Sequence, residues 1–147
     1  KRNSEDLSIR LSDLASKKIL ENIDNIFEEK AVFVNQDHNK SSYAKKIKKE
    51  EGKINWQDSN QKIISKINGL YPNPGGWFIF NGERYKILKA EISKLKGNPG
   101  EVLSQNLDVG CGYNSIKIIK IQRQGKRVQK LKEFLLGNPI KNGSSLN

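Results

Sequence analysis

The dipeptide Asn81-Gly82 lies between an apolar run and a run of mixed apolar and charged residues, and it restricts the fold of the chain more than any other feature. The first run covers residues 77–80 and the second covers residues 83–92. Asn-Gly is a preferred centre for a two-residue hairpin turn, because both central positions of that turn need a positive φ. The apolar phase changes within the second run, and a β-bulge near residues 86–88 would explain the change. The sequence therefore predicts a bent β-hairpin, a unit from which small barrels are built.

Three further segments have the composition of strands: residues 100–104, 107–111 and 115–122. Apolar residues alternate in the second of them up to Cys111, so we expect this single cysteine to be a core thiol and not a nucleophile. One cysteine cannot form an internal disulfide, which is typical of a reducing compartment. Five short strands with flanking helices predict an α+β fold, in which an N-terminal amphipathic helix and a linker precede a small OB-like β-barrel.

Residues 5–29 form the clearest predicted helix. Ser4 is its expected N-cap. The apolar residues recur at three- and four-residue steps on a single stripe, made of Leu7, Leu11, Leu14, Ala15, Ile19, Ile23, Ile26 and Phe27. A lone helix cannot bury such a stripe. It must dock on the barrel, on a second copy of the chain in a dimer, or on a domain outside this sequence.

Two shorter helices are expected around the barrel. A capping-box pattern predicts that the first begins after Asp58, and Gly69 is expected to end it. The run Pro-Asn-Pro-Gly-Gly at residues 72–76 then fixes an extended elbow before the hairpin. The second short helix is expected over residues 129–136, and residues 141–147 are expected to form a polar tail.

The charge of the chain is large and unevenly distributed. It carries 27 Lys and Arg against 16 Asp and Glu, a formal net charge of +11, and such a surplus usually serves an anionic partner. Residues 1–37 have a net charge of −2, residues 38–69 of +5 and residues 70–147 of +8. We therefore expect a helical arm over residues 1–37, a basic linker over 38–56 and a barrel domain over 57–147.

Several classes of protein are disfavoured. No apolar run approaches the ~20 residues of a membrane-spanning helix, and the first residues lack the apolar core of a signal peptide. We therefore expect a cytoplasmic protein. The chain has no Met, which suggests a part of a longer protein. His38 has neighbours that offer no partner for metal binding or acid–base chemistry, so we expect it in a solvated loop.

Lysines are concentrated in residues 43–53, where flexible ammonium groups could neutralise a phosphate backbone without reading its sequence. A solvated lysine-rich surface is the alternative interpretation. Two glutamates interrupt the run and favour an ordered segment over a disordered tail. The candidate phosphate contacts in this segment are Lys45, Lys46, Lys48, Lys49 and Lys53. Those on the barrel are Lys86, Lys89, Lys117, Lys120, Arg123, Lys126 and Arg127, the last three around a predicted turn.

Specific motifs occur in a fixed order over nearly the whole chain. They are Tyr43-Ala44, Lys46, Lys49-Glu50-Glu51, Ile54-Asn55-Trp56, residues 67–75, Lys86-Ile87, Pro99-Gly100, residues 109–112, Gln122, Gly125-Lys126 and Phe134-Leu135. This set resembles the C-terminal part of the methionyl-tRNA formyltransferase family, and residues 10–20 resemble the last helix of that family's catalytic domain. Asn55, Asn68 and Asn73 depart from the pattern, since the family usually has Asp, a basic residue and Trp there.

The resemblance implies a full-length enzyme that moves a formyl group from 10-formyltetrahydrofolate to methionyl initiator tRNA in translation initiation. The family's catalytic residues and folate pocket lie in an N-terminal domain, which would precede this sequence. No catalytic residue, metal site or bound cofactor is therefore expected in the chain itself. The implied partners are initiator methionyl-tRNA and the missing catalytic domain. The implied role is tRNA binding by the basic linker and the barrel.

Two other functions stay open at this point. A different folate-dependent formyltransferase, acting on an amino sugar or hydrolysing formyl-folate, can carry a related barrel but would not need the positive charge of residues 70–147. A free-standing RNA-binding OB-like module would stack bases on exposed aromatic residues. Trp77, Phe78 and Phe80 are candidates for such stacking, although the same side chains suit a core. A basic barrel without a nucleic-acid partner is the remaining alternative.

Overall fold

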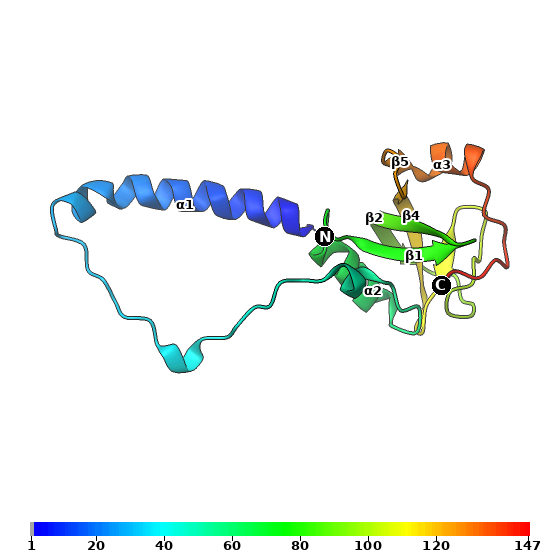
Figure 1. The fold of residues 1–147 in the computed structure, drawn as a ribbon, viewed down its shortest axis with the longest axis horizontal. Helices are drawn as coiled ribbons and strands as arrows, with labels where there is room; N and C mark the ends of the chain where they lie inside the picture. Colours follow the sequence, from blue (N-terminus) through cyan, green and yellow to red (C-terminus); the bar gives the residue numbers. More distant parts are fainter. Residues whose placement is uncertain (1) are drawn as a thin grey trace. The chain divides into compact units, whose positions relative to one another are not determined.

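A computed structural model describes residues 2–147 (Figure 1). The described chain forms two compact units. One consists of residues 48–147 together with the first residues up to Ser4, and the other is Glu5–Ile47. Helices and an antiparallel sheet are both present, so the predicted α+β class is confirmed. None of the helices in residues 2–147 is both long and apolar enough to cross a bilayer.

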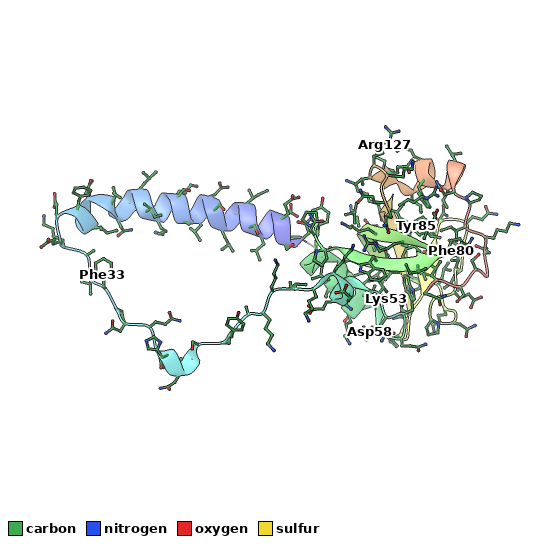
Figure 2. The ribbon with its side chains drawn as sticks, viewed as in Figure 1. Phe33, Lys53, Asp58, Phe80, Tyr85 and Arg127 are labelled. Atoms are coloured by element: carbon green, nitrogen blue, oxygen red, sulfur yellow. The ribbon has the colours of Figure 1, made fainter. Side chains whose placement is uncertain are left out.

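The unit Glu5–Ile47 contains the helix α1 (Ser4–Phe27), apart from its first residue, and the short 3-10 helix η1 (His38–Lys40). The predicted helix is confirmed, although it ends two residues earlier than expected and Ser4 is its first residue and not its N-cap. No residue of α1 is buried, so its apolar stripe lies exposed within this unit. The segment between the two helices is extended, and Phe33 is 81% exposed (Figure 2). His38 is exposed in η1, as expected for a solvated residue.

The larger unit is built on an antiparallel sheet with the strand order β1-β2-β4-β3, and β5 pairs with β4 outside this path. The strands are β1 (Gly76–Phe80), β2 (Glu83–Ser93), β3 (Asp108–Gly110), β4 (Ser115–Arg123) and β5 (Gln129–Lys130). The hydrogen-bonded path of these five strands does not close on itself, so as named strands they form an open sheet.

The hairpin prediction is confirmed. Phe80 pairs with Glu83, and the two residues between them have φ angles of 49° and 76°, as the expected turn requires. The predicted bulge is also present, because the register of β2 against β4 shifts between Ile87 and Ala90. This bulge bends β2, so that the long strand can follow the curvature of the core.

The prediction of a strand at residues 100–104 is wrong. In this segment only Glu101 and Val102 form isolated bridges, to Ser145 and Val109. The fifth strand is instead β5, a short pairing that the sequence pattern assigned to a helix. Residues 129–130 form an antiparallel pairing with the edge of β4. Because they are part of this pairing, α3 (Leu131–Gly137) starts two residues later than predicted.

The expected polar tail is also wrong. Leu146 is only 2% exposed and packs in the core. The backbone of Asn147 donates to the carbonyl of Ile79 over 2.9 Å, and the backbone of Leu146 donates to that of Gly100 over 2.8 Å. The end of the described chain therefore forms part of the folded unit, and one buried leucine anchors it.

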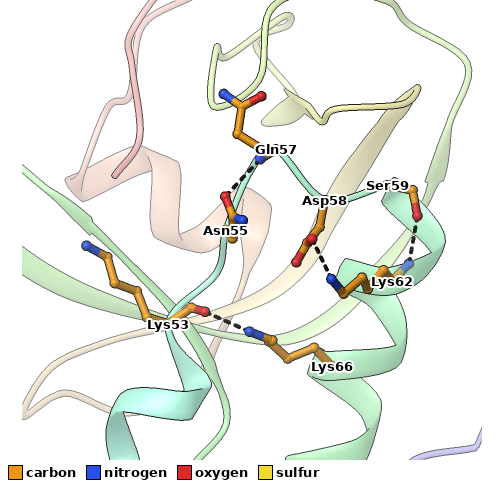
Figure 3. A network of polar contacts seen from close by, with 7 residues as sticks. All are labelled: Lys53, Asn55, Gln57, Asp58, Ser59, Lys62 and Lys66. Carbon is orange, nitrogen blue, oxygen red and sulfur yellow. Dashed lines mark hydrogen bonds and ion pairs between the residues drawn. The ribbon is translucent and has the colours of Figure 1, made fainter.

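Two helical segments precede the sheet, η2 (Lys49–Gly52) and α2 (Asn60–Gly69). The N-cap of α2 is Ser59 and not Asp58. The hydroxyl of Ser59 accepts a hydrogen bond of 3.3 Å from the backbone nitrogen of Lys62 (Figure 3). Asp58 instead forms an ion pair of 2.7 Å with the ammonium group of the same lysine. The expected end of the helix at Gly69 is confirmed.

A chain of aromatic rings runs through the core of the larger unit. The ring centroids are 6.0 Å apart for Trp56 and Phe78, 5.6 Å for Phe78 and Tyr85, and 5.7 Å for Tyr85 and Phe134. Phe78 and Phe134 are fully buried. Because each ring contacts the next, the segment between η2 and α2, the hairpin and α3 share one hydrophobic core, which Ile63, Ile64 and Ile67 of α2 complete. Phe78 is therefore a core residue and not a platform for bases.

Candidate nucleic-acid interface

Basic side chains of the larger unit gather at two places on its sheet. Lys49, Arg84 and Lys86 lie around Trp77, and we call these three residues the Trp77 group. A separate cavity lies beside β4 and β5, and we call it the lysine pocket. It is lined by Lys89, Lys117, Lys120, Lys130 and Lys132, among other residues. Each place combines residues predicted from the sequence with residues that the prediction missed.

Trp77 holds the basic segment against the sheet. Its indole Nε1 donates a hydrogen bond of 2.9 Å to the backbone carbonyl of Lys49 in η2, and its backbone forms a parallel bridge with Lys53. Gly52 makes this close approach possible, since a Cβ atom there would lie only 2.3 Å from the carbonyl oxygen of Gly75. The lysines that follow residue 47 are therefore carried by an ordered segment.

The side chains of Lys48, Lys49 and Lys53 are exposed, although their backbone is fixed. The carboxylate of Glu51 accepts a hydrogen bond of 2.6 Å from the backbone nitrogen of Lys48 and closes the turn of η2. The carbonyl of Lys53 accepts from the ammonium group of Lys66 at 3.0 Å (Figure 3). Glu51 thus orders the lysine-rich segment, and the lysine ammonium groups stay available to an anion.

Arg84 is a member of the Trp77 group that the sequence prediction missed. Its guanidinium carbon lies 5.5 Å from the centroid of the Trp77 ring, within the range of a cation–π contact. In the register of the hairpin, Trp77 lies opposite Lys86 and Ile79 lies opposite Arg84. Arg84 and Lys86 are two residues apart on one strand and so share a face, a signal that strand periodicity could have supplied.

Lys86 is half-buried and partly engaged within the fold. Its ammonium group donates to the carbonyl of Pro72 and to the side-chain oxygen of Asn73, both at 3.2 Å. Burial lowers the pKa of Lys86, and the charges of Arg84 and Lys49 lower it further. The three cations therefore repel one another, and a phosphate placed among them would relieve that repulsion.

Arg123 is engaged in an ion pair within the fold. Its guanidinium binds the carboxylate of Glu83, which also accepts a hydrogen bond of 3.0 Å from the hydroxyl of Tyr85. The Arg123 hydrogen bond, followed by that of Tyr85, lowers the pKa of Glu83. A second nitrogen of Arg123 donates to the side chain of Asn138 at 3.4 Å. Its guanidinium is thus less available to an external phosphate than the ammonium groups of Lys48, Lys49 and Lys53, in and beside η2.

The lysine pocket brings together Lys89, Lys117 and Lys120, three of the predicted residues, and adds Lys130 and Lys132, which the prediction missed. The cavity measures about 560 Å³. The sequence assigned residue 130 to a helix that in fact begins one residue later, so its position beside β4 was not foreseen.

Besides Lys48, Lys53 and Arg123, four further predicted residues lie outside both places. Lys45 and Lys46 are exposed residues of the unit Glu5–Ile47. Lys126 and Arg127 are exposed beyond the end of β4, and Figure 2 labels Arg127. The expected turn is present there: the backbone of Lys126 donates to the carbonyl of Arg123 at 3.0 Å, and its carbonyl accepts from the side chain of Gln122 at 2.8 Å.

Cys111 is a core thiol, as predicted. It is 3% exposed, and burial raises the pKa of its thiol to about 11, so the thiol is protonated at neutral pH. In the part of the chain that the structure describes, no three His, Cys, Asp or Glu side chains are grouped so that they could hold a metal ion. The features that stand out at the surface are therefore the two basic places.

Comparison with known proteins gives a consistent family. The family model described as "Formyl transferase, C-terminal domain" matches residues 46–139. Methionyl-tRNA formyltransferase of Pelagibacter ubique is 55% identical over 145 residues, which are 98% of this chain and 47% of that protein. The protein of the same name from Rickettsia bellii is 36% identical over 135 residues, 90% of this chain and 44% of that protein. The chain thus spans about half the length of the curated relatives it matches.

Solved structures with the same fold come from HypX of Aquifex aeolicus. A variant of that protein has a TM-score of 0.73 at 18% identity, and the match covers 99% of this chain and 30% of the HypX chain. The structure of HypX in complex with tetrahydrofolic acid has a TM-score of 0.62 at 20% identity, covering 88% and 26%. At these identities the likeness concerns the fold alone.

Proposed function

The chain belongs to the formyl transferase C-terminal domain family, and we propose that it is the tRNA-binding part of a methionyl-tRNA formyltransferase. The observation that carries the proposal is the similarity to the Pelagibacter ubique enzyme along almost the whole chain. The full-length protein would move a formyl group from 10-formyltetrahydrofolate to the amino group of methionyl initiator tRNA, in the cytoplasm. The reacting groups and the folate site would belong to a domain that precedes this sequence.

The proposed division of labour follows from the size of the substrate. The catalytic site has to reach one amine at the end of a large polyanion. A second domain that holds the RNA backbone positions this amine and raises its local concentration. The excess of basic over acidic residues in the larger unit suits that task, since lysines bind phosphates without reading the sequence. Selection of the initiator tRNA would then depend on the catalytic domain and the acceptor end.

The basic residues differ in how well they suit phosphate contact. Lys48, Lys49 and Lys53 are the strongest candidates, because their backbone is fixed and their side chains are exposed. Arg84 joins them beside Trp77. Lys86 would contribute its charge while it also supports the elbow. The remaining proposed contacts are Lys45, Lys46, Lys89, Lys117, Lys120, Lys126 and Arg127, with Arg123 contributing least because of its pair with Glu83.

We also propose that the larger unit is an OB-like barrel. Support comes from backbone hydrogen bonds outside the named strands. Gly110 donates to the carbonyl of Glu101 at 2.9 Å, and Val102 donates to that of Ser144, also at 2.9 Å. The backbone of Asn147 is in turn hydrogen-bonded to the backbone of Ile79 in β1. These bonds link the two edges of the open sheet through irregular segments, an arrangement expected of a small barrel with short strands.

The proposed organisation has an arm over residues 1–37, a basic linker over 38–56 and a barrel over 57–147. Ile54 and Trp56 are buried in the core of the larger unit, so the end of the linker would pack on the barrel. The exposed apolar stripe of the arm would be covered by the catalytic domain or by a second copy of the chain.

Titration of fluorescently labelled initiator tRNA with the chain, at several KCl concentrations, tests the proposal. We expect micromolar or weaker binding that falls steeply with salt, with a slope corresponding to ~4–6 phosphate contacts. Binding that is absent, or that does not respond to salt, would contradict the tRNA-positioning role.

A further inference from the structure

Three lysines lie opposite one another across three neighbouring strands. Lys89 of β2 is paired with Lys120 of β4, and Lys120 is paired with Lys130 of β5. Like charges placed directly opposite each other destabilise a sheet. Among residues 2–147, Lys120 and Lys130 have no ion-pair partner that would offset this repulsion, and Lys89 reaches only Glu91, at 3.6 Å. This row of charge is therefore unfavourable without an anion.

The same lysines border a cavity with an apolar surface. Ile119 and the largely buried Leu131 line it together with the lysines, above the fully buried Ile118, and Glu133 is the only carboxylate among the lining residues. Its volume of about 560 Å³ falls within the range of ~300–1,000 Å³ that is usual for small-ligand sites. A phosphate alone would need the lysines but not the apolar surface. The combination suits an anionic group attached to a flat, weakly polar one.

We propose that the lysine pocket binds one unpaired nucleotide of an RNA strand. The phosphate would lie among Lys89, Lys120 and Lys130, and the base would rest against Ile119 and Leu131. In double-stranded RNA the bases are stacked inside the helix, whereas loops and ends can extend a base into a protein pocket. The inference rests on the tRNA-binding function proposed above and gives it a local preference for a single-stranded segment.

Three probes distinguish an unpaired nucleotide within a strand from paired RNA and from a free nucleotide. They are a uridine octanucleotide, a fully paired RNA duplex and free uridine monophosphate. Methyl signals of Ile118, Ile119 and Leu131 in the NMR spectrum of the intact chain report the cavity directly. We expect the octanucleotide to shift these signals while the duplex binds and leaves them unchanged. Equal shifts with the duplex would overturn the proposal, and so would saturation by free nucleotide at concentrations as low as those of the octanucleotide.

Variants test the two halves of the pocket separately. Lys120→Gln should lower the salt slope of octanucleotide binding by ~0.7, the contribution of one phosphate of a single strand. Ile119→Ala should weaken octanucleotide binding about fourfold without a change of slope. This factor corresponds to a contact with the base that buries apolar surface equal to about one methylene. Lys96→Gln, an exposed lysine outside the pocket with the same change of charge, should alter neither quantity beyond a small general effect.

The outcomes also separate this inference from the proposed function. If tRNA binds with a steep salt slope while the methyl signals and both variants stay as in the unmodified chain, only the pocket proposal fails. If no RNA binds, both proposals fail. Lys120 is exposed, so Lys120→Gln is expected to fold even if Ile119→Ala does not.

Discussion

The indole nitrogen of Trp77 lies 2.9 Å from the backbone carbonyl oxygen of Lys49, and this hydrogen bond joins the basic segment to the first strand of the sheet. The bond explains how a lysine-rich segment can be ordered. Its charges repel one another, yet a half-buried ring and a glycine at position 52 hold its backbone in contact with β1. Ammonium groups that start from a fixed backbone lose less entropy when they bind a phosphate.

Trp77→Phe removes this hydrogen bond while keeping an aromatic ring at the position. We expect a loss of about 1 kcal/mol in the free energy of unfolding, the usual contribution of one such bond. Binding of tRNA should weaken as well, because Lys49 is no longer held. Urea unfolding and tRNA titration measure the two effects. A variant that matches the unmodified chain in both would show that the bond does not organise the basic segment.

Leu146→Ala tests the part played by the end of the chain. The leucine is 2% exposed, so truncating it should lower the free energy of unfolding by ~2–5 kcal/mol. Leu136→Ala is the matched control, because that leucine is 89% exposed and its truncation should have almost no effect. Urea unfolding curves compare the two variants. Similar curves for both would mean that the C-terminal residues do not belong to the core.

Glu83→Gln tests the ion pair with Arg123 through pH. The pKa of Glu83 is lowered in the folded state, so its carboxylate stabilises the fold above the usual pKa of such a group, near 4.5. This contribution is lost as the pH falls through the lowered value. We therefore expect thermal stability to fall less steeply towards acid pH in the variant than in the unmodified chain. Glu50→Gln, at an exposed position, should keep the original steepness.

Cys111 should resist modification in the folded chain. Its burial and raised pKa, about 11, leave little accessible thiolate at pH 8. Incubation with iodoacetamide followed by mass spectrometry is expected to give almost no labelling in buffer and complete labelling in concentrated urea. Rapid and complete labelling of the folded chain would contradict the core position of the thiol.

The parts of the fold that were predictable are those encoded locally. Asn81-Gly82 specifies a turn by its own φ preferences, and the phase change in β2 marks the bulge within a few residues. The parts that were missed depend on distant partners. Residues 129–130 become a strand because the edge of β4 is free, and Leu146 becomes buried because the backbone near Gly100 and Ile79 accepts the chain end.

The candidate interface shows the same division. The composition of residues 43–53 shows a cluster of lysines. It does not show that Lys49 lies beside Trp77, because that position depends on the close contact at Gly52. Arg84 was missed although strand periodicity places it two residues from Lys86. Lys130 could not have been recognised, since its role depends on a strand pairing that the local pattern does not indicate.

The role of the Trp77 group is tested by the salt dependence of tRNA binding, measured for the unmodified chain and for the double variant Lys49→Gln/Arg84→Gln. The dissociation constant is determined at several KCl concentrations for each. We expect the logarithmic salt slope of the double variant to be smaller by ~1.8, which corresponds to two lost phosphate contacts. An unchanged slope, with the same affinity at low salt, would contradict the proposal that the Trp77 group holds the tRNA backbone.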